Sequence, residues 1–587
     1  MSRWTTRRTN EDGYAAILLA ILLPTVFIGL CAIGVDVARG YVEVERVQKA
    51  ADAGSLAGVP YMPHDLATAT TTAKSVTARN SYDDASSSVN VTAAQGSRPS
   101  QLRVTVSSTI DNTFGSMLGL PTTTITRSAT ADYTAPAPMG SPCNTFGNEP
   151  PSQAGAAQPT GSALPVPAFS NCNSQPNFWA AVEGPETTKG QGDRYSTLEC
   201  GVSGVYGCDG ARNNTEYLDE GYFFLVKVQP AAVNKPITMQ LYDPAFTYTN
   251  VSCNGLPGNS GFSNNMNPYV MTDGKARYLN SPSKYCSGDY LPGAAPVSTT
   301  FALREQTDTH DPMKGAVISN CVKQYRGRTT APTVNSLKST SGSYNRGLAE
   351  VFHSWVDMCT FTPTREGDYY LQVRTNVGLG GIAQPNTNGN SSVTYSGNSA
   401  AGAASGNTST GEGVNSFAIR AVPSPSTLAS SVSVAGWARM PILQNAPSSA
   451  ATFNLIRALP AAAGQVIEFD FFDGGDCSGS CSGTVQVLRP TDATGSITST
   501  TYLQGCQGAK NRGTYSNLSN CAVNVSNSTH NGQLQSMAIP IPADYNCDSI
   551  SIAGCWFQVK MDFPGGSVTD ITTWDGSVGG DPVRLVE

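Results

Sequence analysis

An uncharged apolar segment near the N-terminus constrains this chain more than any other feature. Residues 13–35 read GYAAILLAILLPTVFIGLCAIGV and contain no Asp, Glu, Lys or Arg. As an α-helix that rises about 1.5 Å per residue, a segment of this length reaches across a bilayer core of about 30 Å. The sequence therefore predicts a transmembrane helix over residues 13–35.

The charges before this segment predict its orientation. Three arginines among residues 1–12 are partly offset by Glu11 and Asp12, and positively charged flanks stay on the cytoplasmic side of a membrane. We therefore expect residues 1–12 to be a cytoplasmic tail of a single-pass bacterial membrane protein whose remaining chain is extracytoplasmic. A cleaved signal peptide is the alternative, but its apolar region is usually shorter and ends in an A-x-A box, which is missing here.

The number and positions of the cysteines also predict that the chain after the apolar segment is exported. Of 15 cysteines, Cys31 lies in the apolar segment and the other 14 all follow residue 140. An even set spread over long polar stretches predicts disulfides formed in an oxidising compartment, because zinc sites need closely spaced thiol and imidazole groups. Cys31 is expected to be an inert apolar side chain.

The composition of the exported part predicts β structure. Only 13% of the residues are charged, whereas the chain has 58 Gly and 37 Pro, which suits short strands joined by many turns. A length of 587 residues predicts several domains. The net charge of -7 and the lack of a Lys and Arg cluster exclude nucleic acid as an expected partner.

The N-terminal helix is expected to continue beyond the membrane. The following stretch contains no proline up to residue 59, and a stripe recurs at spacings of four and three: Val37, Tyr41, Val44, Gln48, Ala51 and Ser55. Such a stripe predicts a packing face. Two partners for this face remain open, namely the protein's own first domain and the helices of partner subunits.

The same stretch resembles a known family. An apolar helix is followed by Asp, an aromatic residue and Gln-x-Ala-Ala-Asp-Ala, and the matching positions are Asp36, Tyr41, Gln48, Ala50, Ala51, Asp52, Ala53, Leu56 and Ala57. This order resembles the N-terminal region of TadG-like (TadE/TadG) proteins of the Flp, or tight adherence, pilus assembly system. The resemblance implies contacts with other pilus or envelope assembly proteins through the N-terminal helix, and it implies nothing about the exported domains.

The chain after the membrane segment divides by composition and pattern. Residues 36–134 are expected to form a helix extension and a small α+β module, because a helical pattern is followed by alternating, strand-like segments. Residues 135–165 are rich in Pro, Gly, Ala and Ser, which predicts a linker.

The rest of the chain contains an internal duplication. ITMQLYDPA at 237–245 matches IEFDFFDGG at 467–475, YYLQVRTN matches CWFQVKMD, and the end strand NSFAIRAV is paired with DPVRLVE. We therefore expect each half to form a disulfide-bonded, jelly-roll-like β-sandwich, the first over residues 166–425 and the second over residues 426–587. The halves hold eight and six cysteines, so each can close its own bridges.

Few residues suggest catalysis. The chain has four histidines, none of which lies in an H-E-x-x-H pair, and it has no G-x-S-x-G elbow. We therefore expect no enzyme. An envelope-anchored polysaccharide hydrolase remains the alternative, because a sequence does not show whether two carboxylates face one sugar ring.

One acidic segment is a candidate metal site. DFFDGGDCSG places Asp470, Asp473 and Asp476 between glycine turns, and such carboxylates could supply the oxygen ligands of Ca²⁺. The segment lacks the EF-hand pattern, so aspartates that cap a turn after a strand remain the alternative. No other cofactor is expected.

These observations predict a mainly β, membrane-anchored, extracytoplasmic protein that is a structural or adhesive component of Flp pilus or cell-envelope assembly. Its expected partners are the membrane, the assembly proteins that contact its N-terminal helix, and a surface glycan or host ligand bound by the exported domains.

Overall fold

The structure, a computed structural model of the chain, divides into two compact units. Unit 1 comprises Met1–Tyr133 and Asp581–Glu587, and unit 2 comprises Thr134–Gly580. The described residues are 12–62, 66–97, 101–133, 136–147, 178–210, 212–218, 220–247, 269–270, 276–277, 298–307, 311–328, 332, 334–337, 339–375, 382–384, 393–395, 412–446, 450–475, 482–564, 568–578 and 583–585.

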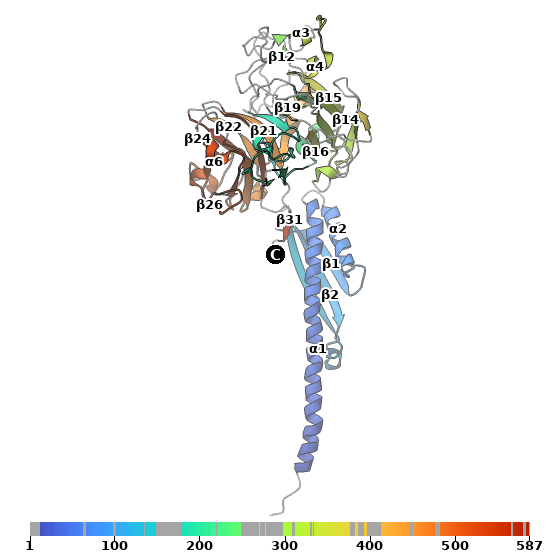
Figure 1. The fold of residues 1–587 in the computed structure, drawn as a ribbon. Coiled ribbons are helices and arrows are strands. Elements are labelled where there is room, and N and C mark those ends of the chain that lie inside the picture. Colours follow the sequence, from blue (N-terminus) through green and yellow to red (C-terminus); the bar gives the residue numbers. More distant parts are fainter. Residues whose placement is uncertain are drawn as a thin grey trace, which may run out of the picture. The chain divides into compact units, whose positions relative to one another are not determined.

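Unit 1 is a small α+β fold. Its elements are α1 (Asp12–Gly58), α2 (Leu66–Arg79), β1 (Val89–Gln95), β2 (Gln101–Asp111), β3 (Thr122–Tyr133) and β31 (Val583–Leu585). The strands form one antiparallel sheet in the order β1-β2-β3-β31. Figure 1 shows β1 and β2 lying along the C-terminal half of α1. The helical pattern and the alternating, strand-like segments expected between residues 36 and 134 correspond to helices and strands of the structure.

The sheet of unit 1 follows from alternation in its sequence. In β2, Leu102, Val104 and Val106 are fully buried, whereas Arg103 between them is exposed. Successive strand residues point to opposite faces, so one apolar face packs against the helices and the other carries polar side chains.

No helix among the described side chains is long and apolar enough to cross a membrane. Within α1, the side chains of residues 12–16 and 24–30 lie outside the described set.

The C-terminal strand lies elsewhere than the duplication suggested. Val583–Leu585 forms β31, which pairs with β3 of unit 1, with Val583 opposite Tyr133. DPVRLVE is therefore not the end strand of a second repeat, and the pairing of DPVRLVE with NSFAIRAV was wrong. Unit 2 is an insertion between two neighbouring strands of unit 1.

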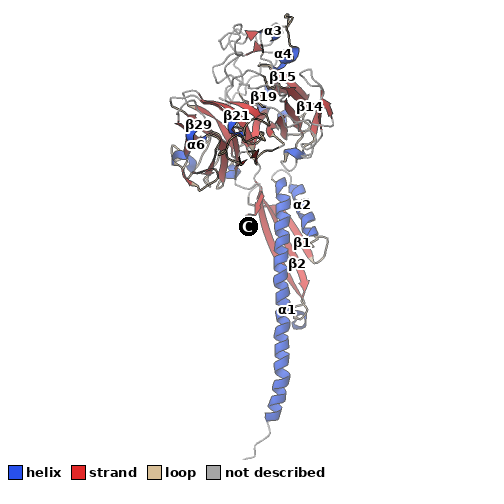
Figure 2. Ribbon diagram, viewed as in Figure 1, coloured by secondary structure: helices blue, strands red, loops and turns tan. Residues whose placement is uncertain are grey.

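The described strands of unit 2 pair in antiparallel fashion, and Figure 2 shows that strands make up most of its described regular structure. The elements of its first part are β4 (Pro138–Met139), β5 (Thr145–Phe146), β6 (Phe178–Glu183), β7 (Cys208–Asp209), β8 (Asn213–Asn214), β9 (Tyr222–Val228), β10 (Ile237–Tyr242), β11 (Tyr269–Val270), β12 (Ala276–Arg277), β13 (Ser298–Arg304), β14 (Val317–Arg326), α3 (Val334–Leu337), α4 (Arg346–Val351), β15 (Trp355–Phe361), β16 (Gly367–Thr375), β17 (Ile382–Gln384), β18 (Val393–Tyr395) and β19 (Val414–Pro423). The later elements are β20 (Val432–Trp437), β21 (Arg439–Ala446), β22 (Ala451–Arg457), β23 (Val466–Phe472), β24 (Ser482–Leu488), β25 (Gln507–Lys510), β26 (Ser516–Asn517), β27 (Ala522–Ser526), α6 (Asn527–His530), β28 (Leu534–Pro540), β29 (Trp556–Asp562) and β30 (Val568–Val578).

The strand pairing repeats between the two halves of unit 2. β10 lies between β15 and β19, and β23 lies between β28 and β30. β16 lies between β9 and β13, and β29 lies between β22 and β24. The segments matched in the sequence as ITMQLYDPA with IEFDFFDGG, and as YYLQVRTN with CWFQVKMD, therefore occupy equivalent places.

Strands also pair across the two halves. β6 joins β19 to β21, which pairs with β30, so one row of strands is continuous from β15 to β28. A second row is continuous because β20 joins β9 to β4, which pairs with β22. One apolar core takes buried residues from both rows, including Phe178, Phe224 and Phe557. The predicted division at residues 425 and 426 stays a prediction.

The stretch expected to be a linker begins with packed structure. β4 and β5 lie within residues 135–165, and the side chains of Met139 and Phe146 are fully buried in the core of unit 2. These apolar side chains explain why residues 136–147 belong to unit 2. Residues 148–165 lie outside the described residues.

The predicted disulfides are confirmed for the following described cysteines: Cys200–Cys208, Cys321–Cys359, Cys506–Cys521 and Cys547–Cys555. Each bridge joins two cysteines of the same half of the duplication. Cys143 is also disulfide-bonded, and Cys31 is a free, exposed thiol in α1.

Candidate functional site

The motif residue Asp36 holds the loop between β2 and β3. Its Oδ1 atom accepts a hydrogen bond from the Thr113 backbone N–H at 2.9 Å, and its Oδ2 atom accepts from Phe114 at 2.8 Å and Gly115 at 2.7 Å. One helical turn on, Arg39 donates to the Thr113 hydroxyl. Four hydrogen bonds from one face of α1 thus fix this loop beside the helix.

The electrostatics of Asp36 follow from these bonds. Desolvation alone would raise the pKa of its carboxyl, but the N–H groups of Gly115, Phe114 and Thr113 outweigh this effect and lower the pKa. Asp36 is therefore a carboxylate at neutral pH, and its charge strengthens the bonds that hold the loop.

The Gln-x-Ala-Ala-Asp-Ala motif packs against unit 1 itself. Gln48 donates to Asp52 at 2.8 Å and to the Ser128 carbonyl of β3 at 3.4 Å. Ala51 is fully buried, whereas Ala53 is partly exposed. The amide of Gln48 therefore links the helix to the sheet, and the small side chain of Ala51 lets the two approach.

Two glycines after this motif let α1 approach its neighbours more closely still. A Cβ atom on Gly54 would lie 2.8 Å from Cγ2 of Thr77, and one on Gly58 would lie 2.5 Å from Leu102 Cδ2 and 2.6 Å from the Ala69 carbonyl oxygen. The last turns of α1 are therefore an internal packing surface built from small residues.

The predicted stripe on α1 divides into two parts. Ala51 and Ser55 are buried, as expected for packing on the protein's own first domain, but Val37 and Tyr41 are 52% and 71% exposed. The covered side of this part of α1 includes the partly exposed Glu43, which accepts hydrogen bonds from Ser108 and Tyr82. Val37 and Tyr41 therefore belong to a free face of α1.

Two of the three candidate calcium ligands, Asp470 and Asp473, lie in the part of the chain that the structure describes. The Asp470 carboxylate contacts Arg512 at 3.1 Å and Arg194 at 3.4 Å. Asp473 is buried with a φ of 61° and accepts the Gly532 backbone N–H at 2.6 Å. Asp476 lies outside the described residues. Calcium at these three aspartates stays a prediction.

Unit 2 contains a buried cluster of charged side chains that was not predicted from the sequence. The guanidinium of Arg194, 1% exposed, contacts Glu216 at 2.5 Å and Asp575 at 2.7 Å, and Lys189 contacts Glu216 at 2.6 Å. Desolvation raises the pKa of Asp575 to about 6, although Arg194 opposes the shift. These groups are far apart in the sequence, and no local motif marks them.

Near this cluster, Glu183 at the end of β6 is fully buried, and neither of its carboxylate oxygens has a hydrogen-bond partner among the described residues. Desolvation raises its pKa well above the ordinary value, and the neighbouring Asp193 adds to the shift. The protonated form is therefore favoured. Asp193 accepts the Glu183 backbone N–H at 2.9 Å and the Tyr222 hydroxyl at 2.5 Å.

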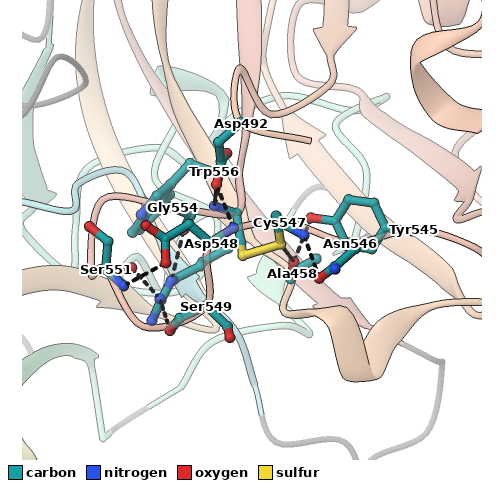
Figure 3. Close-up of a disulfide and its surroundings, with 12 residues drawn as sticks. Ala458, Asp492, Tyr545, Asn546, Cys547, Asp548, Ser549, Ser551, Gly554 and Trp556 are labelled. Carbon is teal, nitrogen blue, oxygen red and sulfur yellow. Dashed lines mark hydrogen bonds between the residues drawn. A yellow bond between two sulfur atoms is a disulfide. The ribbon is translucent and has the colours of Figure 1, made fainter. Parts of the chain in front are cut away.

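Three residues of types that can bind a metal ion lie together in unit 2, namely Asp492 and the disulfide-bonded Cys547 and Cys555 (Figure 3). Asp492 lies beside the Cys547–Cys555 bridge and accepts the Cys555 backbone N–H at 3.1 Å. Arg457 donates to the carbonyl groups of Ser551 at 2.7 Å and Gly554 at 3.0 Å. Because the two sulfurs are bonded to each other, they are not thiolate ligands. The disulfide and these hydrogen bonds instead stabilise the loop.

Comparison with known proteins assigns the helix and leaves unit 2 unassigned. Residues 13–69 match the family described as putative Flp pilus-assembly TadE/G-like. The matched range covers α1 from its second residue and the start of α2. No curated protein matches the chain.

Proposed function

We propose that this protein is a membrane-anchored structural or adhesive component of a Flp-type pilus or of cell-envelope assembly. The observation that carries the proposal is the TadE/G-like match over residues 13–69. The match includes the uncharged residues 13–35 of α1 and the later turns of that helix, which pack inside unit 1. Residues 13–35 form the membrane anchor, with residues 1–12 in the cytoplasm.

The covalent chemistry of unit 2 supports an extracytoplasmic position. Disulfides form and persist in oxidising compartments, and described bridges occur in both halves of unit 2. Strand ladders that continue across both halves favour a rigid body suited to presenting a surface. Presentation to a glycan or a host ligand is the adhesive form of the proposal.

The free face of α1 is the contact surface for assembly partners. Gln48, Ala51 and Gly58 are used inside unit 1, whereas Val37, Tyr41 and Val42 are each more than half exposed. Exposed apolar side chains on a helix that adjoins the membrane favour packing against helices of other subunits.

Site-specific photo-crosslinking tests this assignment. A photoreactive amino acid at Tyr41 is expected to crosslink, in cells that assemble Flp pili, to a pilin or an assembly protein identified by mass spectrometry. The control carries the same group at Thr92, an exposed position on β1. Crosslinks to envelope proteins unrelated to the pilus, or equal crosslinking from both positions, would count against the proposal.

The adhesive form needs its own test. The full chain in proteoliposomes is applied to a glycan array and to host cells, beside an assay for reducing sugars released from envelope polysaccharide. Saturable binding without turnover is expected. Turnover of polysaccharide without binding to surfaces would instead favour the hydrolase alternative.

A further inference from the structure

The loop between β2 and β3 exposes apolar side chains on an ordered backbone. It contains the short 3-10 helix η2 (Gly115–Leu118). Phe114, Met117 and Leu120 are 37%, 84% and 64% exposed. We call these three residues the apolar tip. A group of exposed apolar side chains on one small loop indicates a surface that meets an apolar partner.

The apolar tip is also free of charge over a long stretch. Residues 112–126, NTFGSMLGLPTTTIT, contain no Asp, Glu, Lys or Arg, and Asp111 and Arg127 flank them. Charged residues are the ones that cost most to bring into an apolar or interfacial medium. The composition therefore permits this loop to leave water.

Several backbone groups of the loop already have hydrogen-bond partners in unit 1. Asn112 donates its backbone N–H to the Pro121 carbonyl at 2.9 Å and its side-chain amide to the Leu120 carbonyl at 3.0 Å. The Leu120 N–H donates to Gly115 at 2.9 Å, and Asp36 accepts three more N–H groups. Polar backbone groups that already have partners cost little to move out of water. Insertion would break none of these bonds.

Contacts along α1 place the tip next to the apolar segment. β2 runs antiparallel to α1: a Cβ on Gly58 would touch Leu102, Glu43 accepts the Ser108 hydroxyl at 2.7 Å, and Asp36 holds Phe114. The hairpin of β2 and β3 therefore points toward the N-terminus of α1 (Figure 1). Its loop lies beside Asp36, directly after residue 35. In unit 1, the described large apolar side chains that are exposed lie on α1 or in this tip, apart from Leu66 and Leu585.

We propose that the apolar tip inserts into the headgroup region of the bilayer that residues 13–35 cross, so that unit 1 docks on the lipid surface at a second point. This rests on the membrane anchor proposed above. The lipid surface is the favoured partner because the tip continues the exposed apolar surface of α1. Asp36 is then a positioning residue that sets the depth of the tip.

Depth-dependent fluorescence quenching tests the proposal on the full chain in proteoliposomes. In a Cys31→Ser background, an environment-sensitive dye is attached to Met117→Cys, to Leu22→Cys in the anchor, or to Ala94→Cys at the opposite end of the sheet. The unsubstituted background measures labelling of other thiols. Lipids with a nitroxide near the headgroup are expected to quench the Met117→Cys dye and shift its emission to shorter wavelength, while the Ala94→Cys dye stays in water.

The other outcomes separate the two proposals. A quenched dye at Leu22→Cys with an unquenched, water-like dye at Met117→Cys overturns docking of the tip and leaves the anchor standing. A dye at Leu22→Cys that is not quenched by lipids with a nitroxide deep in the acyl chain overturns the anchor and the docking together. A shifted but unquenched dye at Met117→Cys means that protein covers the tip, which also overturns the lipid proposal. Adding Asp36→Asn is expected to reduce quenching at position 117 and not at position 22.

Discussion

At the scale of single residues, Asp36 does the most to connect sequence with structure. Its partners Thr113, Phe114 and Gly115 lie 77 to 79 positions away in the chain. The sequence motif marks this aspartate, but its role was not predictable, because the pairing depends on how β2 and β3 fold back along α1.

Replacing Asp36 with Asn should loosen the loop without unfolding unit 1. An amide has one acceptor oxygen and no charge, so it cannot hold three N–H groups as the carboxylate does. We expect faster hydrogen exchange at Thr113, Phe114 and Gly115. Asp83→Asn is the matched control, because Asp83 accepts only a local N–H, that of Ala85, and it should leave these amides unchanged. Equal exchange in both variants would contradict the role given to Asp36.

The same bonds predict the direction of a pH effect. The pKa of Asp36 in the folded protein lies below the ordinary value of an aspartate because three backbone N–H groups donate to its carboxylate, so its contribution to stability is present above that ordinary value and is lost as the pH falls through the folded pKa. Protection of the Thr113 amide in the unsubstituted protein should therefore weaken at acid pH. Protection that does not fall on acidification would contradict this prediction.

At the scale of elements, α1 shows how far a helical pattern can be trusted. Its length and the packing of its last turns follow from the sequence, because Ala51 and Ser55 sit where the spacing predicted a buried face. Val37 and Tyr41 continue the same spacing and yet are exposed, because β2 and β3 cover a neighbouring line of the helix. The spacing of residues in a helix predicts which side chains share a face, but it does not predict how far the neighbouring strands extend along that face.

Two glycines of α1 provide a matched pair for testing the packing. Gly58→Ala would push a methyl group into the Ala69 carbonyl and Leu102, so unit 1 should lose about 1–3 kcal/mol. Gly40→Ala meets nothing within 4 Å and should stabilise the helix by about 0.5–1 kcal/mol through its higher helix propensity. Opening free energies from hydrogen exchange in β2 measure both. The same sign for both variants would contradict the packing of α1.

At the scale of the whole molecule, unit 2 enters and leaves through neighbouring strands of unit 1. The sequence predicted repeated strands and paired cysteines, because alternation and turns are local signals. It did not predict that Val583–Leu585 returns to β3, or that β6 and β20 join the two halves, since strand partners are chosen by long-range contacts. The charge cluster around Arg194 was not predicted for the same reason.

This organisation predicts that reduction acts on one unit alone. All the described disulfides lie in unit 2, and Cys31 is the sole cysteine in the sequence of unit 1. A reductant should destabilise unit 2 by about 2–4 kcal/mol for a typical bridge and leave hydrogen exchange in β1, β2 and β3 unchanged. Loss of protection in unit 1 at the same reductant concentration would show that the units do not fold separately.

The proposed role of α1 is to anchor the chain in a membrane, with unit 2 outside the cytoplasm. Protease digestion of intact spheroplasts that carry the full chain with an N-terminal tag tests it most directly. The account predicts that external protease removes unit 2 and leaves a short tagged fragment, with residues 13–35, in the membrane. A chain found in the soluble fraction, or one digested only after the membrane is permeabilised, would contradict it.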